Sequence, residues 1–239
     1  VLFSTRTGLV EALLLDNGYL TDIRTAAAGA VAARCLARAD SSTAAIIGAG
    51  RQAQLQLEAL TLVRDIESAT LWARDPARAE IAAAQSSARL GIPVSACASV
   101  QAATAEADIV VTTTPSLQPL LLAEHVHAGQ HITAMGSDAE HKNEIDPRIV
   151  AEMAHYFCDR LSQVRALGEL HHAIEQKLVG PADSFTEIGQ VIAGAAPGRS
   201  DAAEITLCDL TGTGIQDTAI ATLAYRLCRQ HQAGTVFQS

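Results

Sequence analysis

The chain contains 239 residues, of which 49% are hydrophobic and only 3% are aromatic. A core of this size must be built from Ala, Leu, Ile and Val, which favours helices and parallel sheets over an all-β sandwich. The net charge of −9, without a basic stripe, excludes nucleic acid as an expected partner. No apolar run has membrane-spanning length and the five cysteines form no CxxC pair, so we expect a cytoplasmic protein with no membrane partner.

The first part of the chain predicts two short strands, at residues 1–3 and 11–15, followed by a helix. Thr21 can cap a helix that runs to about residue 38, which would place Arg24 in its first turn. Because the helix dipole disfavours cations there, a bound anion such as a substrate carboxylate could lie between Arg24 and the helix amides. The alternative is a solvated surface arginine.

From residue 42 onward, short β-branched strands alternate with helices. Strands are expected at 44–47, 68–72, 93–96, 108–112, 131–135, 156–158 and 205–210. Helices are expected from the end of the first of these strands to about 63, and over 76–90, 100–105, 161–167, 183–193 and 215–230. This alternation predicts an α/β protein with a Rossmann-type, doubly wound parallel sheet.

We assign residues 36–208 to a dinucleotide-binding domain. Residues 1–35 and 209–239 are then the remainder of a second, incomplete domain for substrate binding and dimerisation. The strand at residues 1–3 begins without a cap or leading polar residues, so we expect residues upstream of the given sequence to complete this second domain.

The apolar run 44–47 ends abruptly in Gly-x-Gly-x-x-Ala, with Gly48 and Gly50 as its glycines, and a helix-forming stretch follows at once. The first glycine permits the tight turn, the second lets a pyrophosphate approach the backbone, and the helix amides face the anion. We therefore expect Gly48, Gly50, Arg51 and Gln52 to bind a dinucleotide. The pattern also arises by chance in chains rich in Ala and Gly.

Two further strand ends carry polar residues that could contact the coenzyme. Arg74 follows the strand 68–72 and suits a 2′-phosphate, whereas the alternative is a solvated arginine beside Asp75 as a helix cap. Thr112, Thr113 and Thr114 end the strand 108–112 and could line the coenzyme, although a following proline also explains an ordinary exit from the strand.

The strand 131–135 ends in Gly136 and Ser137, which we expect to contact the coenzyme, and in Asp138, with Lys142 four residues after Asp138. A carboxylate at a strand end beside a nicotinamide could act as a general acid or base, or hold a substrate ammonium group. Lys142 could keep that carboxylate ionised or contact the nucleotide. The alternative for Asp138 is a helix cap.

The last strand ends at Asp209, before the glycine-rich turn that contains Thr211 and Gly212. The glycines allow the backbone to approach a ligand closely, so we expect these three residues at the substrate site, although a plain turn is the alternative. A metal site is not expected. The histidine pairs His125 with His127 and His171 with His172 lack an acid or cysteine at ligand spacing.

Six segments, in the right order along the chain, together resemble the ornithine cyclodeaminase/μ-crystallin family. They are LTDIRTAA at 20–27, AIIGAGRQAQ at 45–54, ADIVVTTTP at 107–115, GSDAEHK at 136–142, GEL at 168–170 and ITLCDLTG at 205–212. Residues 135–144 are most similar to a branch of the family associated with ectoine utilisation.

The resemblance implies that Asp138 is the catalytic aspartate, that Lys142 contacts the nucleotide and that Arg24 binds the substrate carboxylate. It implies NAD(P) as coenzyme, a homodimer, and a small amino-acid or imino-acid substrate. A cyclodeaminase abstracts hydride from a diamino acid, lets the distal amine attack, releases ammonia and returns the hydride. Arg74, near the position where NAD-recycling relatives carry an acid, is instead similar to reductase-type relatives. An NAD(P)H-dependent imine reductase or amino-acid dehydrogenase and a non-catalytic ligand-binding protein are therefore the alternatives.

Overall fold

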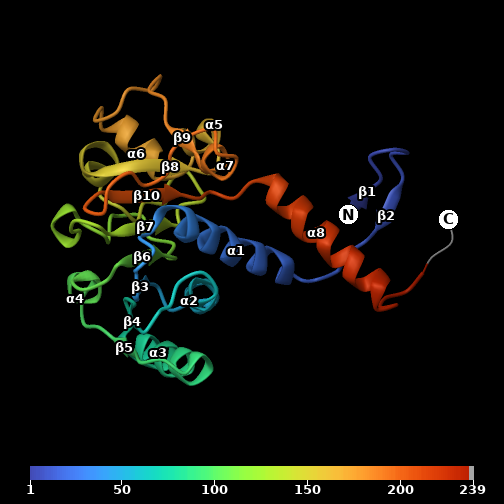
Figure 1. Ribbon diagram of the computed structural model, residues 1–239, viewed down its shortest axis with the longest axis horizontal. Coiled ribbons are helices and arrows are strands. Elements are labelled where there is room, and N and C mark those ends of the chain that lie inside the picture. Colours follow the sequence, from blue (N-terminus) through green and yellow to red (C-terminus); the bar gives the residue numbers. More distant parts are fainter. Residues whose placement is uncertain (237–239) are drawn as a thin grey trace.

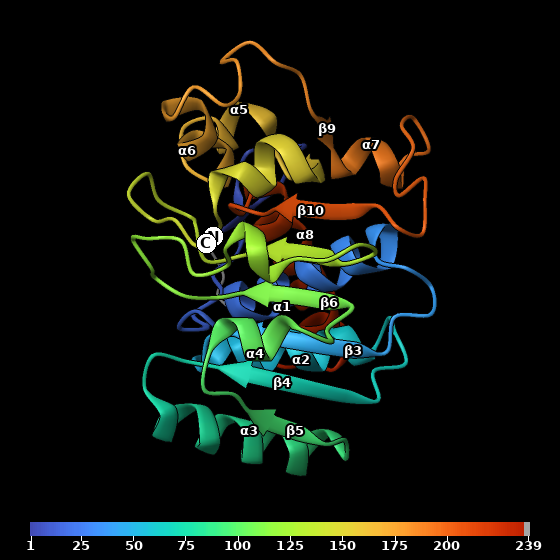
Figure 2. The same ribbon diagram turned by 90° about the vertical axis from the view of Figure 1, so that its left-hand side faces the viewer.

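The computed structural model describes residues 1–236 of the chain. Its centre is an eight-stranded parallel sheet with the strand order β5-β4-β3-β6-β7-β10-β8-β9 (Figures 1 and 2). The first five strands in this order are those of a Rossmann sheet, in which the order reverses between β3 and β6. The predicted α/β fold with a doubly wound parallel sheet is confirmed.

The strands are β1 (Leu2–Phe3), β2 (Val10–Ala12), β3 (Thr43–Ile47), β4 (Ser68–Trp72), β5 (Val94–Ala96), β6 (Ile109–Thr112), β7 (His131–Ala134), β8 (Ala154–Cys158), β9 (Thr186–Glu187) and β10 (Ile205–Asp209). The helices are α1 (Tyr19–Leu36), α2 (Arg51–Thr61), α3 (Pro76–Leu90), α4 (Val100–Thr104), α5 (Leu161–Val164), α6 (Glu169–Glu175), α7 (Ile188–Ile192) and α8 (Gly214–Gln230), with short helices η1 (Ala123–His125) and η2 (Ile149–Met153). The expected helix over 183–193 is wrong in its first half, because Thr186 and Glu187 pair with β8 as an edge strand.

Both faces of the sheet are covered, so its strands are apolar on both sides. In β3, Ala44 and Ile46 pack with Leu57 and Leu60 of α2 in one core cluster. Ala45 and Ile47, which point the opposite way, belong to a second cluster with residues of α4, η2 and α6. Figure 2 shows α4 in front of the sheet and α1 and α2 behind it. The near-continuous apolar composition of the strands follows from this double coverage.

Helix α1 lies against α2 and the sheet, and its small residues permit the close approach. Gly29 is buried, and a Cβ there would lie 2.0 Å from the Gln56 Oε1 atom of α2. The helix begins at Tyr19 after Gly18, which has a φ of 87°, so the predicted start at Thr21 is wrong. Asp16 Oδ2 accepts a hydrogen bond from the Leu20 amide at 2.7 Å and stabilises that start. The domain division at residue 36 stays a prediction.

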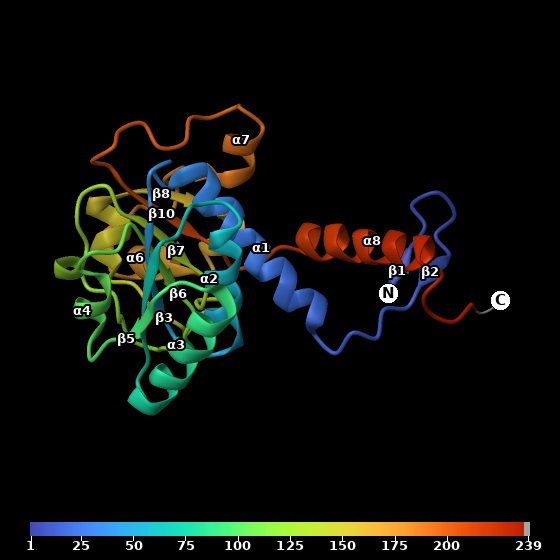
Figure 3. The same ribbon diagram turned by 60° about the horizontal axis from the view of Figure 1, so that its bottom comes forward.

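Helix α8 and the β1–β2 hairpin extend away from the sheet, and the N-terminus lies near them (Figures 1 and 3). No residue of α8 is buried, and its exposed apolar side chains include Ile215, Leu223 and Leu227. Among the residues that the structure describes, no helix is long and apolar enough to cross a membrane.

The contact between α1 and α2 predicts that a large side chain at Gly29 destabilises the protein. Gly29→Leu should lower the free energy of unfolding by about 1–3 kcal/mol, because Gln56 is fully buried and cannot swing into solvent. Urea unfolding measures the change. Gly189→Ala is the matched control, since that helical glycine is exposed and a Cβ there meets nothing within 4 Å. Equal stability of both variants would contradict this packing.

Candidate active site

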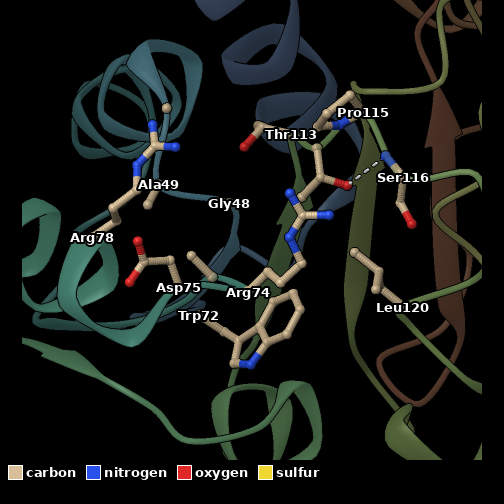
Figure 4. Close-up of a pocket in the computed structure, with 13 residues that line it drawn as sticks. Gly48, Ala49, Trp72, Arg74, Asp75, Arg78, Thr113, Pro115, Ser116 and Leu120 are labelled. Atoms are coloured by element: carbon tan, nitrogen blue, oxygen red, sulfur yellow. Dashed lines mark hydrogen bonds between the residues drawn. The ribbon is translucent and has the colours of Figure 1, made fainter.

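A cleft of about 370 Å³ opens where β3, β4 and β6 end, at the carboxyl edge of the sheet. Figure 4 shows its walls, which come from three segments separated in the sequence. They are the loop 48–50, residues 72–75 with Arg78, and residues 113–116 with Leu120. In open α/β sheets, ligands bind at this edge where the strand order reverses. The cleft therefore lies where the sequence predicted a dinucleotide.

Packing within the protein requires a glycine at position 48, whereas a side chain at position 50 would meet no other protein atom nearby. Gly48 has a φ of 137°, and a Cβ there would lie 2.3 Å from Thr113 Oγ1. Its amide donates to the carbonyl of Trp72 at 2.8 Å, which fixes the turn. Gly50 precedes α2 without a side-chain cap, and a Cβ on it would meet nothing within 4 Å. The bare backbone at the start of α2 thus fits the pyrophosphate of a dinucleotide.

The segment after β4 contributes Arg74 and Asp75 to the cleft, and the first turn of α3 contributes Arg78. Asp75 accepts a hydrogen bond from the Ala77 amide at 3.1 Å and caps α3, as its alternative interpretation expected. Arg74 and Arg78 are exposed and line the cleft. In Figure 4 the side chain of Arg74 extends toward the end of β6, and that of Arg78 toward Ala49.

The three threonines at the end of β6 have different environments. Thr113 and Thr114 line the cleft, as expected. Thr112 is fully buried, so its predicted contact with the coenzyme has no support in this geometry. The Thr114 amide donates to Glu144 Oε1 at 2.5 Å, and Glu144 is a residue that the sequence analysis missed. The local pattern gave no signal for it, because Glu144 lies in a loop without periodicity.

Arg51 and Gln52, both predicted to bind the coenzyme, contact Asp22 of α1. Arg51 forms an ion pair with Asp22. The Gln52 Nε2 atom donates to the backbone carbonyl and the carboxylate of Asp22, both at 3.2 Å. Neither side chain lines the cleft. Their side chains join α1 to the first turn of α2, and their contact with a coenzyme stays a prediction.

Asp138 and Lys142 form an ion pair beyond the end of β7. The Asp138 side chain is 55% exposed and that of Lys142 is 24% exposed. The Ser137 hydroxyl donates to the Lys142 carbonyl at 2.6 Å and closes the loop between them. This loop follows β7, the next strand after β6 in the sheet, so Asp138 lies at the same sheet edge as the cleft although it does not line it.

Arg24, in the second turn of α1, lies beside the turn that follows β10, the strand that neighbours β7. Its guanidinium forms an ion pair with Asp217 of α8 at 3.0 Å and contacts Gln216. A Cβ on Gly212 would lie 2.9 Å from Arg24 Nη1, so the predicted substrate residues Arg24 and Gly212 are adjacent. Because α1 begins at Tyr19, Arg24 is not in its first turn, and the argument from helix amides is wrong.

Thr211 and Gly212 are held by side chains from the end of β8 and from α5. The Gly212 amide donates to Asp159 Oδ2 at 2.7 Å, and Gln163 donates to Thr211 Oγ1 at 2.9 Å. Burial raises the pKa of Asp159 above its usual range. This turn therefore has a defined shape next to Arg24.

Asp209 lies inside the protein and is only 1% exposed. Its Oδ2 atom accepts hydrogen bonds from the Tyr156 hydroxyl at 2.7 Å and the Glu169 amide at 2.8 Å. A Cβ on Gly168 would lie 2.6 Å from the same oxygen, which explains that glycine. Burial raises the pKa of Asp209 to about 7. These contacts give Asp209 a structural role behind the substrate residues, and its direct contact with a substrate stays a prediction.

His171 and His172 do have an acid at ligand spacing, contrary to the sequence analysis. The ligand atoms of His171, His172 and Glu175 lie within 4.8 Å of one another. His172 Nε2, however, contacts the Lys142 carbonyl at 2.7 Å. This contact ties α6 to the loop that carries Asp138.

The whole of residues 1–232 matches the model of the ornithine cyclodeaminase/mu-crystallin family. The chain belongs to this family, and the resemblance predicted from its motifs is confirmed.

The relatives include both deaminases and redox enzymes. A proposed dehydrogenase of Rhizobium meliloti is 63% identical, and an uncharacterized cyclodeaminase of Sinorhizobium fredii is 56% identical. Each alignment covers 100% of this chain and 72% of the relative. The Δ1-pyrroline-2-carboxylate reductase of Thermococcus litoralis, solved with NADH and L-proline, is 31% identical with a TM-score of 0.93. That alignment covers 98% of this chain and 72% of the other.

The two glycines predict separable effects on folding and on coenzyme binding. Gly50→Ala should leave the unfolding midpoint near that of the wild type and weaken NAD(P)H binding about tenfold or more, because the new methyl group occupies only the ligand's space. Quenching of Trp72, the one tryptophan of the sequence, measures binding in the cleft. Gly48→Ala should also lower the unfolding midpoint. A Gly50→Ala variant with wild-type affinity would contradict the placement of the pyrophosphate.

Proposed function

We propose that this protein is an NAD(P)-dependent, cyclodeaminase-like enzyme acting on a small diamino acid. The observation that supports this most is the order of groups along one sheet edge. The Gly48–Gly50 cleft, the Asp138–Lys142 pair and the Arg24 site lie at the ends of β3, β7 and β10. A coenzyme, a proton-transfer group and a carboxylate-binding group are the parts that this chemistry needs.

The bound nicotinamide supplies hydride acceptance and donation, and the protein supplies orientation and proton transfer. Arg24 binds the substrate carboxylate. Its guanidinium already holds one carboxylate, that of Asp217, whose side chain is 57% exposed and free to give way. Asp138 takes the proton released from the substrate α-amino group and steers the distal amine toward the imine carbon. Lys142 orients the Asp138 carboxylate, because its ammonium group is paired with it.

An NAD(P)H-dependent imine reductase or amino-acid dehydrogenase is the second candidate. NAD-recycling relatives are expected to carry an acid near the end of β4, but here Ala73 follows β4 directly. The next acid, Asp75, caps α3 instead of projecting freely to a ribose, which favours this candidate. Net reduction would use the same three groups, with Asp138 donating a proton to the product amine. A binding protein without turnover, of the crystallin type, is the third candidate.

We further propose that two copies of the chain associate through α8 and the β1–β2 hairpin. Phe3, Val10, Ile215 and Leu223 are large apolar side chains of this arm that the single chain leaves at least half exposed. A protein without a partner rarely exposes so many apolar side chains on one projection.

The nature of the reaction is tested by following ammonia and NAD(P)H together on diamino acids and cyclic imines. Ammonia release at constant nicotinamide absorbance supports cyclodeamination, and net NAD(P)H consumption supports the reductase. Asp138→Asn should lower kcat about 100-fold or more in either case, because the amide cannot transfer the proton. Glu140→Gln, an exposed change in the same loop, should leave kcat unaltered. Full activity of Asp138→Asn would remove Asp138 from the mechanism.

The two arginines of the cleft predict a preference for the 2′-phosphorylated coenzyme. Trp72 quenching should show NADPH binding more than about tenfold more tightly than NADH, because each charged hydrogen bond to phosphate contributes about 1.5–3 kcal/mol. Arg74→Ala and Arg78→Ala should each lower this preference about tenfold without weakening NADH. Arg89→Ala, which removes an arginine bound to Glu58 at the far end of α3, is the control. Equal affinity of the wild type for both coenzymes would refute the preference.

A further inference from the structure

Neighbouring strands β6 and β7 stop pairing shortly before the residues that form the site. Their register ends at Thr112 opposite Ala134, and the Met135 amide makes one more hydrogen bond, 3.1 Å long, to the Thr112 carbonyl. Beyond that point the Glu144 carboxylate connects the segment that follows β6 with the segment that follows β7. Its Oε1 atom accepts from the Thr114 amide at 2.5 Å, and its Oε2 atom from the Gly136 amide at 2.8 Å.

Glu144 itself is held from several sides and is fully buried. Its amide donates to Glu169 Oε1 at 3.0 Å, and its carbonyl accepts from the amides of Leu120 and Leu121 at 2.8 and 3.0 Å. Space at the carboxylate is also closed, because a Cβ on Gly136 would lie 2.3 Å from Glu144 Oε2. The carboxylate therefore cannot move without moving the strand ends.

Each strand end that Glu144 holds leads to a different part of the site. Thr114 belongs to the wall of the coenzyme cleft, and Asp138 follows Gly136 by two residues. Glu144 lines no part of that cleft. Its carboxylate therefore joins the part of the chain that contacts the coenzyme to the part that carries the proton-transfer group.

We propose that Glu144 is a positioning residue, whose carboxylate sets the separation between the coenzyme wall at Thr114 and the loop that carries Asp138. The inference rests on the proposed function for the roles of these two segments. The link itself is independent of which reaction the enzyme performs.

The charge on Glu144 matters for this role. Only the ionised carboxylate presents two acceptors to the two amides, whereas protonation turns one oxygen into a donor facing an N–H group. Burial raises the pKa of Glu144 to about 7, against the hydrogen bonds that lower it. Glu169 of α6 faces Glu144, Asp209 of β10 lies behind Glu169, and the loop on the other side carries Asp138 and Lys142. Coenzyme affinity should therefore rise as the pH increases through about 7.

The experiment compares Glu144→Gln with a matched variant at the opposite edge of the sheet. Asp108 also binds two backbone amides, accepting from Ser42 at 2.8 Å and Thr43 at 3.1 Å, and so joins the starts of β3 and β6. Asp108→Asn removes a similar link far from the site. Hydrogen exchange followed by mass spectrometry reports local opening in both variants, and Trp72 quenching reports coenzyme affinity between pH 6 and 8.

In Glu144→Gln, amides in 113–116 and 136–142 should exchange about tenfold faster, because one hydrogen bond to a charged group is lost. Asp108→Asn should speed exchange only near residues 41–43. If turnover is found, kcat of Glu144→Gln should fall about 100-fold, and its coenzyme KM should rise toward that of the wild type at pH 6. The wild-type pH dependence of affinity should disappear in Glu144→Gln and persist in Asp108→Asn.

Unchanged exchange in both site segments of Glu144→Gln, or an unaltered pH dependence of affinity, would overturn the positioning role. Failure of the proposed function gives a different result. In that case no substrate turns over, yet the exchange and the affinity still respond to Glu144→Gln. The two hypotheses are thus tested separately.

Discussion

The site depends on the close packing of the bare Gly48 backbone against Thr113 where β3 turns into α2. Gly48 adopts a φ of 137° directly against the Thr113 side chain, so only a residue without a Cβ lets the ends of β3 and β6 approach this closely. The first turn of α2 then begins at a position where no side chain caps it. Helix amides and a closely packed strand end together form a surface for a diphosphate. A larger residue at Gly48 would separate the two strand ends on which the cleft is built.

A second constraint is the set of buried carboxylates behind the site. Hydrogen bonds from backbone amides link three acidic residues in series. The Glu144 amide donates to the Glu169 carboxylate, and the Glu169 amide donates to the Asp209 carboxylate. Burial raises the pKa of all three side chains. Burying carboxyl groups costs stability unless their hydrogen bonds are satisfied, and here backbone amides satisfy most of them. This cost in stability is consistent with a need to hold the segments that carry Glu144, Glu169 and Asp209 in fixed positions at one edge of the sheet.

The arm formed by α8 and the hairpin serves a different purpose from the sheet. It contributes Asp217 to Arg24 and otherwise exposes apolar side chains. The substrate end that we propose therefore lies where the sheet meets the arm, whereas the coenzyme cleft lies at the edge of the sheet itself. The names of the relatives, a proposed dehydrogenase, an uncharacterized cyclodeaminase and a reductase, indicate that the family includes different activities.

The sequence by itself determined the sheet, the glycine turn and the family, because these depend on local patterns: short apolar strands, a Gly-x-Gly spacing and collinear motifs. It also placed Gly48, Gly50, Arg74, Thr113 and Thr114, which the structure brings into one cleft. Only the tertiary structure decided that Arg51 and Gln52 turn to Asp22, that Asp209 is buried, and that Arg24 faces Asp217. Glu144 was invisible in the sequence for the same reason. Glu169 lies 25 residues along the chain from Glu144, and Asp217 lies 193 residues from Arg24. Only the folded protein brings such distant residues within hydrogen-bond distance.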